Sequence, residues 1–222
     1  MQLNAKEILE RHINNGLSSA RALFEHAERN APEDAIVRAT AMKFTPSASG
    51  VLVNYGGSGM RKLHKHALVQ MATKAGIPSA YLAGLSQGED WQRELSATIM
   101  REHFANDEAK YLVRSVVDAR GEDVQVRGFL SDRYRRLDSR PLLHAFAEEC
   151  EKIGAKPVGG TISDTRLAVK AIVPQVFEPV PGEAIAFGVE WGNSDFGSAK
   201  HTVRAFMLRL WCLNGATMEN AL

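Results

Sequence analysis

The chain has 222 residues, of which 45% are hydrophobic and 24% are charged, as in an ordinary globular protein with one full core. Its net charge is +1, from 27 Lys and Arg against 26 Asp and Glu. This balance excludes a strongly basic nucleic-acid-binding arm, but it allows a basic face on the folded surface.

Other global features indicate a protein of the bacterial or host cytoplasm with no membrane contact. Cys150 and Cys212 both lie in apolar sequence, which favours two reduced, buried thiols over a disulfide. No apolar run approaches the roughly 18 residues of a membrane span, and the N-terminus has no signal-peptide pattern. The chain stops soon after the apolar stretch AFMLRLWCLNG. Either this strand closes the fold, or the chain is the front part of a longer protein.

The first half of the chain is predicted to be mainly helical. Asn4 and Glu7 resemble a capping box, and Asn14-Asn15-Gly16 is typical of a helix stop, so two helices are expected in the first 30 residues. A strand hairpin follows over AIVRATAMKF and GVLVNY. Further helices are predicted after the glycine-rich loop at 56–59, over IPSAYLAGL, and from Asp90 to Phe104. The expected buried stripe of the last helix is Trp91, Leu95, Ile99 and Phe104.

Strands dominate the second half. A hairpin is predicted from AKYLVRSVVD and VQVRGFL, followed by a helix from about Arg140 to Ile153. A strand pair then turns near Ser163-Asp164, and GNSDFGSAK links a last pair. This order favours an α+β fold with a largely antiparallel sheet built from hairpins, flanked by helices contributed mostly by the N-terminal half. We predict a single domain over residues 1–222, with residues 1–30 as an N-terminal helical segment.

Patterns for phosphate loops, metals and nucleophiles are weak. The loop at 56–59 could offer free N–H groups to a phosphate, but a flexible turn is the favoured interpretation. His64 and His66 are two apart on an expected helix, so they point to different faces and do not suit zinc. Ser131 has no local base, and no G-x-S-x-G motif is present. We therefore expect no metal, no cofactor and no catalytic residue.

The most distinctive stretch is VRGFLSDRYRRLDSRPLL, residues 126–143, which contains five arginines. Guanidinium groups bind phosphates bidentately, and a base can stack on Tyr134. The same arginines could instead pair with nearby carboxylates such as Asp132, Asp138 and Glu148, or form a subunit contact, and these alternatives stay open. The candidate nucleic-acid-binding residues are Arg127, Arg133, Tyr134, Arg135, Arg136, Lys62, Lys65, Arg166 and Lys170.

A second candidate is the linker GNSDFGSAK. It is either a functional loop or a turn that needs these residue types for its backbone geometry. Its motif residues are Asn193, Ser194, Asp195 and Gly197.

Three motifs in order resemble the phage- and plasmid-related "domain of unknown function 932" family. Residues Phe129–Asp138 are similar to its FLS-x-x-Y segment, Asn193–Gly197 to its NS-x-x-G loop, and Cys212–Gly215 to its C-x-NG strand end. The upstream HKHALVQMATKAGIPSAYLAGL looks like a family helix, so the resemblance spans about Leu63–Gly215. It implies a phage, prophage or plasmid setting. A more remote likeness is to phage single-strand annealing proteins, which hold single-stranded DNA along a basic groove, usually as rings or filaments.

The resulting expectation is a non-enzymatic DNA-metabolism protein that binds single-stranded DNA and promotes strand annealing in DNA recombination. Annealing requires only a neutralised backbone and free base edges. The expected partners are single-stranded DNA, further copies of the chain in a homo-oligomer, and a phage exonuclease or host protein. One alternative is a protein-interaction module, such as a host-defence inhibitor or an assembly factor. Another is an enzyme with a site around Asn193, Asp195 and His201.

Overall fold

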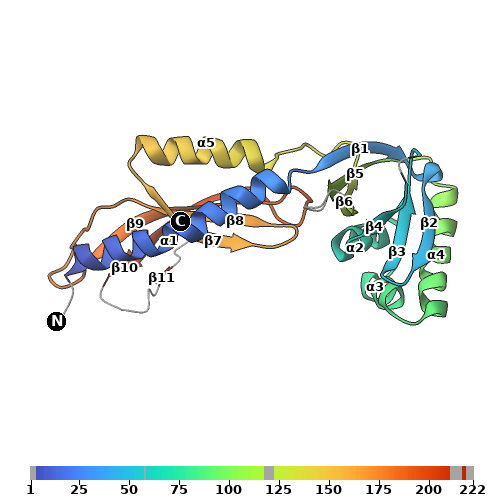
Figure 1. Cartoon of the computed structure of the whole chain (residues 1–222), viewed down its shortest axis with the longest axis horizontal. Helices are drawn as coiled ribbons and strands as arrows, with labels where there is room; N and C mark the ends of the chain where they lie inside the picture. The colour runs from blue at the N-terminus through green and yellow to red at the C-terminus, as the bar shows by residue number, and fades with distance from the viewer. Residues whose placement is uncertain (1–3, 58, 118–122, 211–216, 219–222) are drawn as a thin grey trace. The chain divides into compact units, whose positions relative to one another are not determined.

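The computed structural model describes residues 4–57, 59–117, 123–210 and 217–218 (Figure 1). Contacts between residues divide the chain into two compact units. Unit 1 comprises Met1–Arg29, Leu137–Ser194 and Ala199–Leu222, and unit 2 comprises Asn30–Arg136 and Asp195–Ser198. The expectation of a single domain over residues 1–222 stays a prediction, and each unit is described by itself.

Unit 1 is an antiparallel sheet with two helices. The strand order is β11-β10-β9-β8-β7. Helix α1 packs along β7, and α5 contacts both β7 and β9 (Figure 1). The bounds are α1 Ala5–Arg29, α5 Ser139–Lys152, β7 Lys156–Ile162, β8 Leu167–Ile172, β9 Ile185–Asn193, β10 Thr202–Arg209 and β11 Thr217–Met218.

Helix α1 is one continuous helix, so the predicted stop at Asn14–Gly16 is wrong. The capping box is confirmed, because the Glu7 N–H donates to Asn4 Oδ1 at 2.9 Å and the Asn4 N–H donates to Glu7 Oε2 at 3.0 Å. Gly16 faces β7, where a Cβ would lie 2.1 Å from the Val158 carbonyl oxygen. Packing therefore overrides the local stop signal. The buried positions keep helical spacing throughout: Leu9, Ile13, Gly16, Ala20, Leu23 and Ala27.

The two ends of α1 pack on opposite faces of the unit 1 sheet. Leu23, near its C-terminal end, shares a core cluster with Val169 of β8 and with residues of α5. Leu9, near its N-terminal end, shares a different cluster with Ile172, also of β8. Val169 and Ile172 are three apart in one strand, so their side chains point to opposite faces. Helix α1 therefore crosses from the α5 face to the other face past the edge strand β7.

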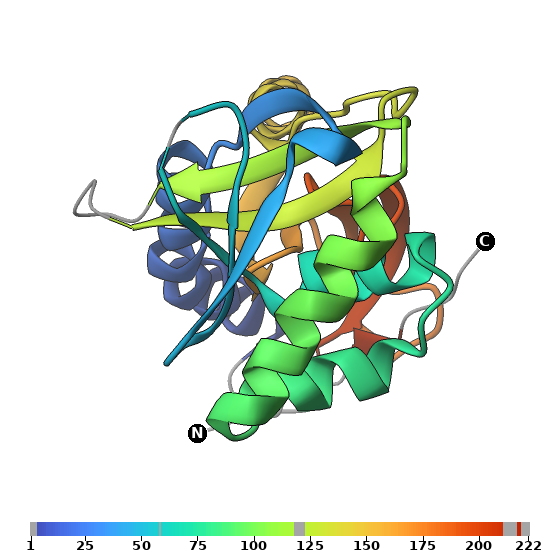
Figure 2. The same cartoon turned by 90° about the vertical axis from the view of Figure 1, so that its right-hand side faces the viewer.

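Unit 2 is a mixed sheet with three helices. The strand order is β1-β5-β6-β4-β3-β2, and β4 pairs with β6 in parallel while the other pairs are antiparallel. Helices α2, α3 and α4 pack against one another and against β2, β3 and β6 (Figure 2). The bounds are β1 Glu33–Arg38, η1 Ala39–Ala41, β2 Lys43–Ser47, β3 Gly50–Asn54, β4 Arg61–Leu63, α2 Lys65–Lys74, α3 Ser79–Gln87, α4 Asp90–Ala105, β5 Lys110–Val117 and β6 Val124–Ser131.

These elements confirm an α+β fold, with the helices mostly from the N-terminal half. The predicted pairs β5–β6, β7–β8 and β9–β10 are confirmed. The first predicted hairpin is right only for β2–β3, because β1 pairs with β5 instead. The glycine-rich loop leads into β4 and not directly into a helix. The stripe of α4 is partly wrong, since Trp91 is 61% exposed whereas Ala97 and Met100 are buried.

Within the described residues, the structure bears on two expectations from the whole sequence: the buried cysteines and the lack of a membrane span. Cys150 is a free, buried cysteine, and burial raises the pKa of its thiol, so it is a poor nucleophile at neutral pH. Cys212 and the C-x-NG strand end lie outside the described residues. Within the described ranges, none of the helices combines the length and apolar character needed to cross a bilayer.

Replacing Gly16 tests the close approach of α1 to β7. We expect Gly16→Ala to lower the free energy of unfolding by about 2 kcal/mol, because the new Cβ forces the helix and strand apart. Urea unfolding followed by circular dichroism measures the change. The control is Asn15→Ala, one residue away and exposed, which should be neutral or stabilising because alanine favours helix. A Gly16→Ala variant as stable as the parent would show that the two backbones do not meet.

Candidate nucleic-acid interface

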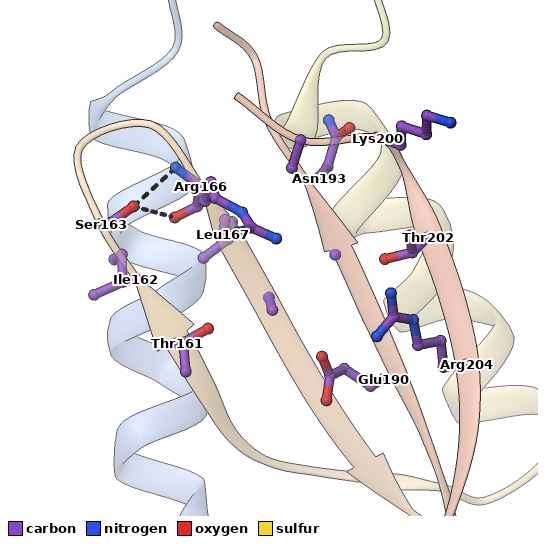
Figure 3. Close-up of a pocket in the computed structure, with 13 residues that line it drawn as sticks. Thr161, Ile162, Ser163, Arg166, Leu167, Glu190, Asn193, Lys200, Thr202 and Arg204 are labelled. Carbon is purple, nitrogen blue, oxygen red and sulfur yellow. Dashed lines mark hydrogen bonds between the residues drawn. The ribbon is translucent and has the colours of Figure 1, made fainter. Parts of the chain in front are cut away.

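A basic pocket of about 540 Å³ lies on the unit 1 sheet, on the face opposite α5 (Figure 3). Register partners in one row across an antiparallel sheet have side chains on the same face. One such row forms the floor, and its two central residues are small. Ala168 has only a methyl group, and Gly192 has no side chain. The floor is therefore hollow between taller neighbours. The row is Thr161, Ala168, Gly192 and Thr202, from β7 to β10.

The next row on this face is charged. Lys170, Glu190 and Arg204 are register partners across β8, β9 and β10. Lys170 Nζ lies 3.2 Å from Glu190 Oε2, and both side chains are about three-quarters buried. The same ammonium lies 5.5 Å from the ring centroid of Phe206. The charge of Lys170, a predicted binding residue, is therefore already engaged by Glu190.

The open end of the pocket carries two more cations. Arg166 precedes β8 and Lys200 precedes β10, and Figure 3 shows both at the upper end of the strands, above Thr202 and Arg204. The Arg166 N–H donates to Ser163 Oγ at 3.1 Å, which fixes the backbone of the turn (Figure 3). Within the described ranges, no carboxylate pairs with the side chains of Arg166, Lys200 or Arg204.

This arrangement suits an anion with several oxygens. The guanidinium groups of Arg166 and Arg204 can each donate two parallel hydrogen bonds to a phosphate, and Lys200 adds a point charge. The hydroxyls of Thr161 and Thr202 add further donors at the floor. None of the residues that line the pocket is aromatic. A nucleic acid bound here would be held by its backbone and not by base stacking.

The arginines at 127–140 do not form one cluster. Arg127 Nε donates to Gln125 Oε1 at 2.9 Å, within β6. Arg140 belongs to unit 1, where its Nε lies 2.8 Å from Glu28 Oε2 of α1. Arg133 and Arg135 are exposed, and no ion pair involves them in the part of the chain that the structure describes.

Tyr134 and the two lysines of unit 2 take separate positions. The Tyr134 N–H donates to the Ser131 carbonyl oxygen at 2.9 Å, in the turn after β6, and the residue is half-buried. Lys62 pairs with Asp123 across 2.6 Å. Lys65 is exposed as the first residue of α2. A role for these residues in nucleic-acid binding stays a prediction.

Arg136, with 55% of its side chain exposed, belongs to an ion-pair network around Asp34. Arg114, with 1% of its side chain exposed, donates from Nε to Asp34 Oδ1 at 2.7 Å. The other carboxylate oxygen accepts from Arg136 Nη1 at 2.8 Å. Arg114 also donates to the Asp195 carbonyl oxygen at 2.6 Å. Asp34 and Arg114 are register partners of β1 and β5, and sequence reasoning missed this pairing.

The residues of the motif loop make structural contacts. The side-chain amide of Asn193 donates to the Leu137 carbonyl oxygen at 2.7 Å and to Ser139 Oγ at 3.0 Å, at the start of α5. Gly197 has φ 75°, and a Cβ there would lie 2.7 Å from the Leu130 side chain. Ser194 is buried. These contacts support the interpretation of the loop as a turn that requires its residue types.

The residues of the enzyme alternative are also engaged. His201 Nε2 accepts from Trp191 Nε1 at 3.0 Å. The pocket that Asn193 lines takes all its residues from unit 1 and does not include His201.

His64 caps α2 by accepting the His66 N–H at 3.2 Å, and His66 Nε2 lies 3.0 Å from the Phe196 carbonyl oxygen. Among described residues, no group of three His, Cys, Asp or Glu side chains is placed to hold a metal ion.

Comparisons with family models, with curated proteins and with solved structures each found no match. The resemblance to the phage- and plasmid-related family therefore rests on the sequence motifs alone and stays a prediction.

The Asp34 network generates a stability prediction. We expect Asp34→Asn to cost about 3 kcal/mol of unfolding free energy, because it removes the negative charge that the buried Arg114 guanidinium contacts. The control is Asp123→Asn in the same unit, which breaks the exposed pair with Lys62 and should cost less than about 1 kcal/mol. Chemical denaturation of both variants gives the comparison. Equal effects would mean that Arg114 does not depend on Asp34.

Proposed function

We propose that the chain binds single-stranded nucleic acid through the basic pocket on the unit 1 sheet. The observation that carries the proposal is the set of three cations, Arg166, Lys200 and Arg204, around a hollow floor and without a carboxylate partner in the described part of the chain. Such cations neutralise phosphates and release the counterions that the strand had condensed, which drives binding.

The same chemistry accounts for annealing. A nucleic-acid strand held by its phosphates keeps its base edges available to a complementary strand, and no covalent bond has to be made or broken. The pocket contributes hydroxyl and cationic donors but no stacking surface, so we expect little sequence preference. In this proposal the centre of the interface lies at 161–204 and includes Arg166, one of the candidate residues of the sequence analysis.

Arg133 and Arg135 remain a separate candidate surface. They are exposed in unit 2 and carry no ion pair in the described ranges. They stand in the turn segment that follows β6, whereas Arg136 is held by Asp34. We expect them to add less affinity than the pocket cations, because isolated exposed arginines have no fixed donor geometry.

The decisive experiment is a salt series of fluorescence anisotropy with a labelled single-stranded oligonucleotide. The variant Arg166→Gln/Lys200→Gln/Arg204→Gln should lose at least about tenfold in affinity at low salt. Its log–log salt slope should become shallower by about 2, since each phosphate contact on a single strand contributes roughly 0.7.

The matched control removes the same number of exposed cations elsewhere in unit 1, as Lys6→Gln/Arg11→Gln/Lys156→Gln. Both variants lower the net charge equally, so a general electrostatic effect would weaken both alike. The control should lose less than about threefold in affinity. Equal losses of affinity in the two variants, or no binding by the parent chain at low salt, would contradict the proposal.

Glu190 gives a prediction of opposite sign. Its carboxylate is an anion within the pocket, paired with Lys170. Glu190→Gln should raise oligonucleotide affinity about threefold, because a bound phosphate no longer meets a like charge and Lys170 becomes available. Glu151→Gln, on the exposed surface of α5, changes the net charge identically and should have little effect. Weaker binding by Glu190→Gln would mean that the oligonucleotide binds outside this pocket.

A further inference from the structure

Unit 2 holds a second pocket of about 730 Å³ between β3, β4, α2 and α3. Val51 and Leu68 line it and are buried. Leu63, Val69 and Ala83 also line it and are half-buried. This size and apolar lining are those of pockets that hold small organic molecules, which have volumes of about 300–1,000 Å³.

Gly84 keeps this pocket open. It stands in the interior of α3, where glycine costs about 1 kcal/mol relative to alanine. A Cβ built at Gly84 meets no atom within 4 Å, and the residue is not among those with positive φ. Gly16 of α1 is different, because the Val158 backbone leaves no room for a side chain. Neither packing nor backbone geometry within the described chain accounts for glycine at position 84.

Lys65 gives the pocket a single charge. It is the one charged side chain among the residues that line the pocket, it is exposed, and no ion pair involves it in the described ranges. The hydroxyl of Ser86 is already used, since it donates to the Ala83 carbonyl oxygen at 2.9 Å. Among described residues, the pocket therefore presents a mostly apolar lining, with Ser79 and Gln87 as further polar residues, and one cation without an ion pair. A polyphosphate would need several cations, as the unit 1 pocket provides.

We propose that this pocket binds an amphipathic anion, in which an apolar alkyl or aryl body lies against Val51, Leu68 and Ala83 and a carboxylate or sulfonate contacts Lys65. The body removes apolar surface from water, and the ammonium sets the orientation of the head group. The missing side chain at Gly84 leaves room for the body. This binding does not depend on the nucleic-acid proposal, because its residues all belong to unit 2.

The test uses two probes, the fluorescent aryl sulfonate 8-anilinonaphthalene-1-sulfonate and decanoate. The full chain should enhance the fluorescence of the sulfonate saturably, and decanoate should displace it. Decanol, which has the same alkyl body and no charge, should compete at least about tenfold less well. Failure of decanoate to displace the sulfonate would overturn the proposal.

Two variants separate the body site from the charge site. Gly84→Leu fills the space and should abolish sulfonate binding while the melting temperature stays equal or rises, since leucine favours helix. Its control, Ala145→Leu on the exposed surface of α5, should bind as the parent does. Lys65→Gln should weaken decanoate about tenfold and leave decanol unchanged, whereas Lys74→Gln, at the other end of α2, should leave both unchanged.

The outcomes decide between the parts of the proposal. Parental binding by Gly84→Leu would exclude the pocket as the body site. Equal loss of decanoate and decanol binding in Lys65→Gln would exclude Lys65 as the anion contact. Oligonucleotide affinity should be the same in Gly84→Leu and the parent, so failure here is distinguishable from failure of the unit 1 interface.

Discussion

The close approach of α1 to the edge strand β7 is the constraint on which unit 1 depends. Gly16 lets the helix backbone meet the Val158 backbone, so that α1 crosses the edge of the sheet there. Its C-terminal half then packs on the face that α5 also covers, and its N-terminal half packs on the other face near Ile172. The row from Thr161 to Thr202 lines the basic pocket.

The sequence predicted those structural elements that depend on residues close together in the chain. Capping at Asn4, the helix over IPSAYLAGL and the pairs of consecutive strands in the second half all follow from short-range patterns, and they are present in the structure. The stop at Asn14–Gly16 was wrong because packing against Val158 outweighs a local turn signal. A signal did exist: buried positions from Leu9 to Ala27 keep helical spacing through the glycine.

The candidate site was harder to predict than the fold. A dense run of arginines in the sequence does not make a cluster in space. Arg136 forms an ion pair with Asp34 and Arg140 with Glu28, and both carboxylates are far away along the chain. Conversely, Arg166 precedes β8, Lys200 precedes β10 and Arg204 lies in β10, and these residues come together only through strand register. Alternation along β10 does place Thr202 and Arg204 on one face, but nothing local identifies Arg166 as their neighbour.

The carboxylate of Asp34 has a consequence for the order of folding. Residues 30–136 interrupt unit 1 between α1 and α5, and the ion pair of Asp34 with Arg136 brings the two ends of this insertion together. A long disordered loop between α1 and α5 would carry a large closure entropy, whereas a folded insertion with adjacent ends acts as a short connection. We therefore expect the sheet of unit 2 to form before α1 docks on β7, so that α1 is among the last elements to reach its place although it precedes unit 2 in the chain.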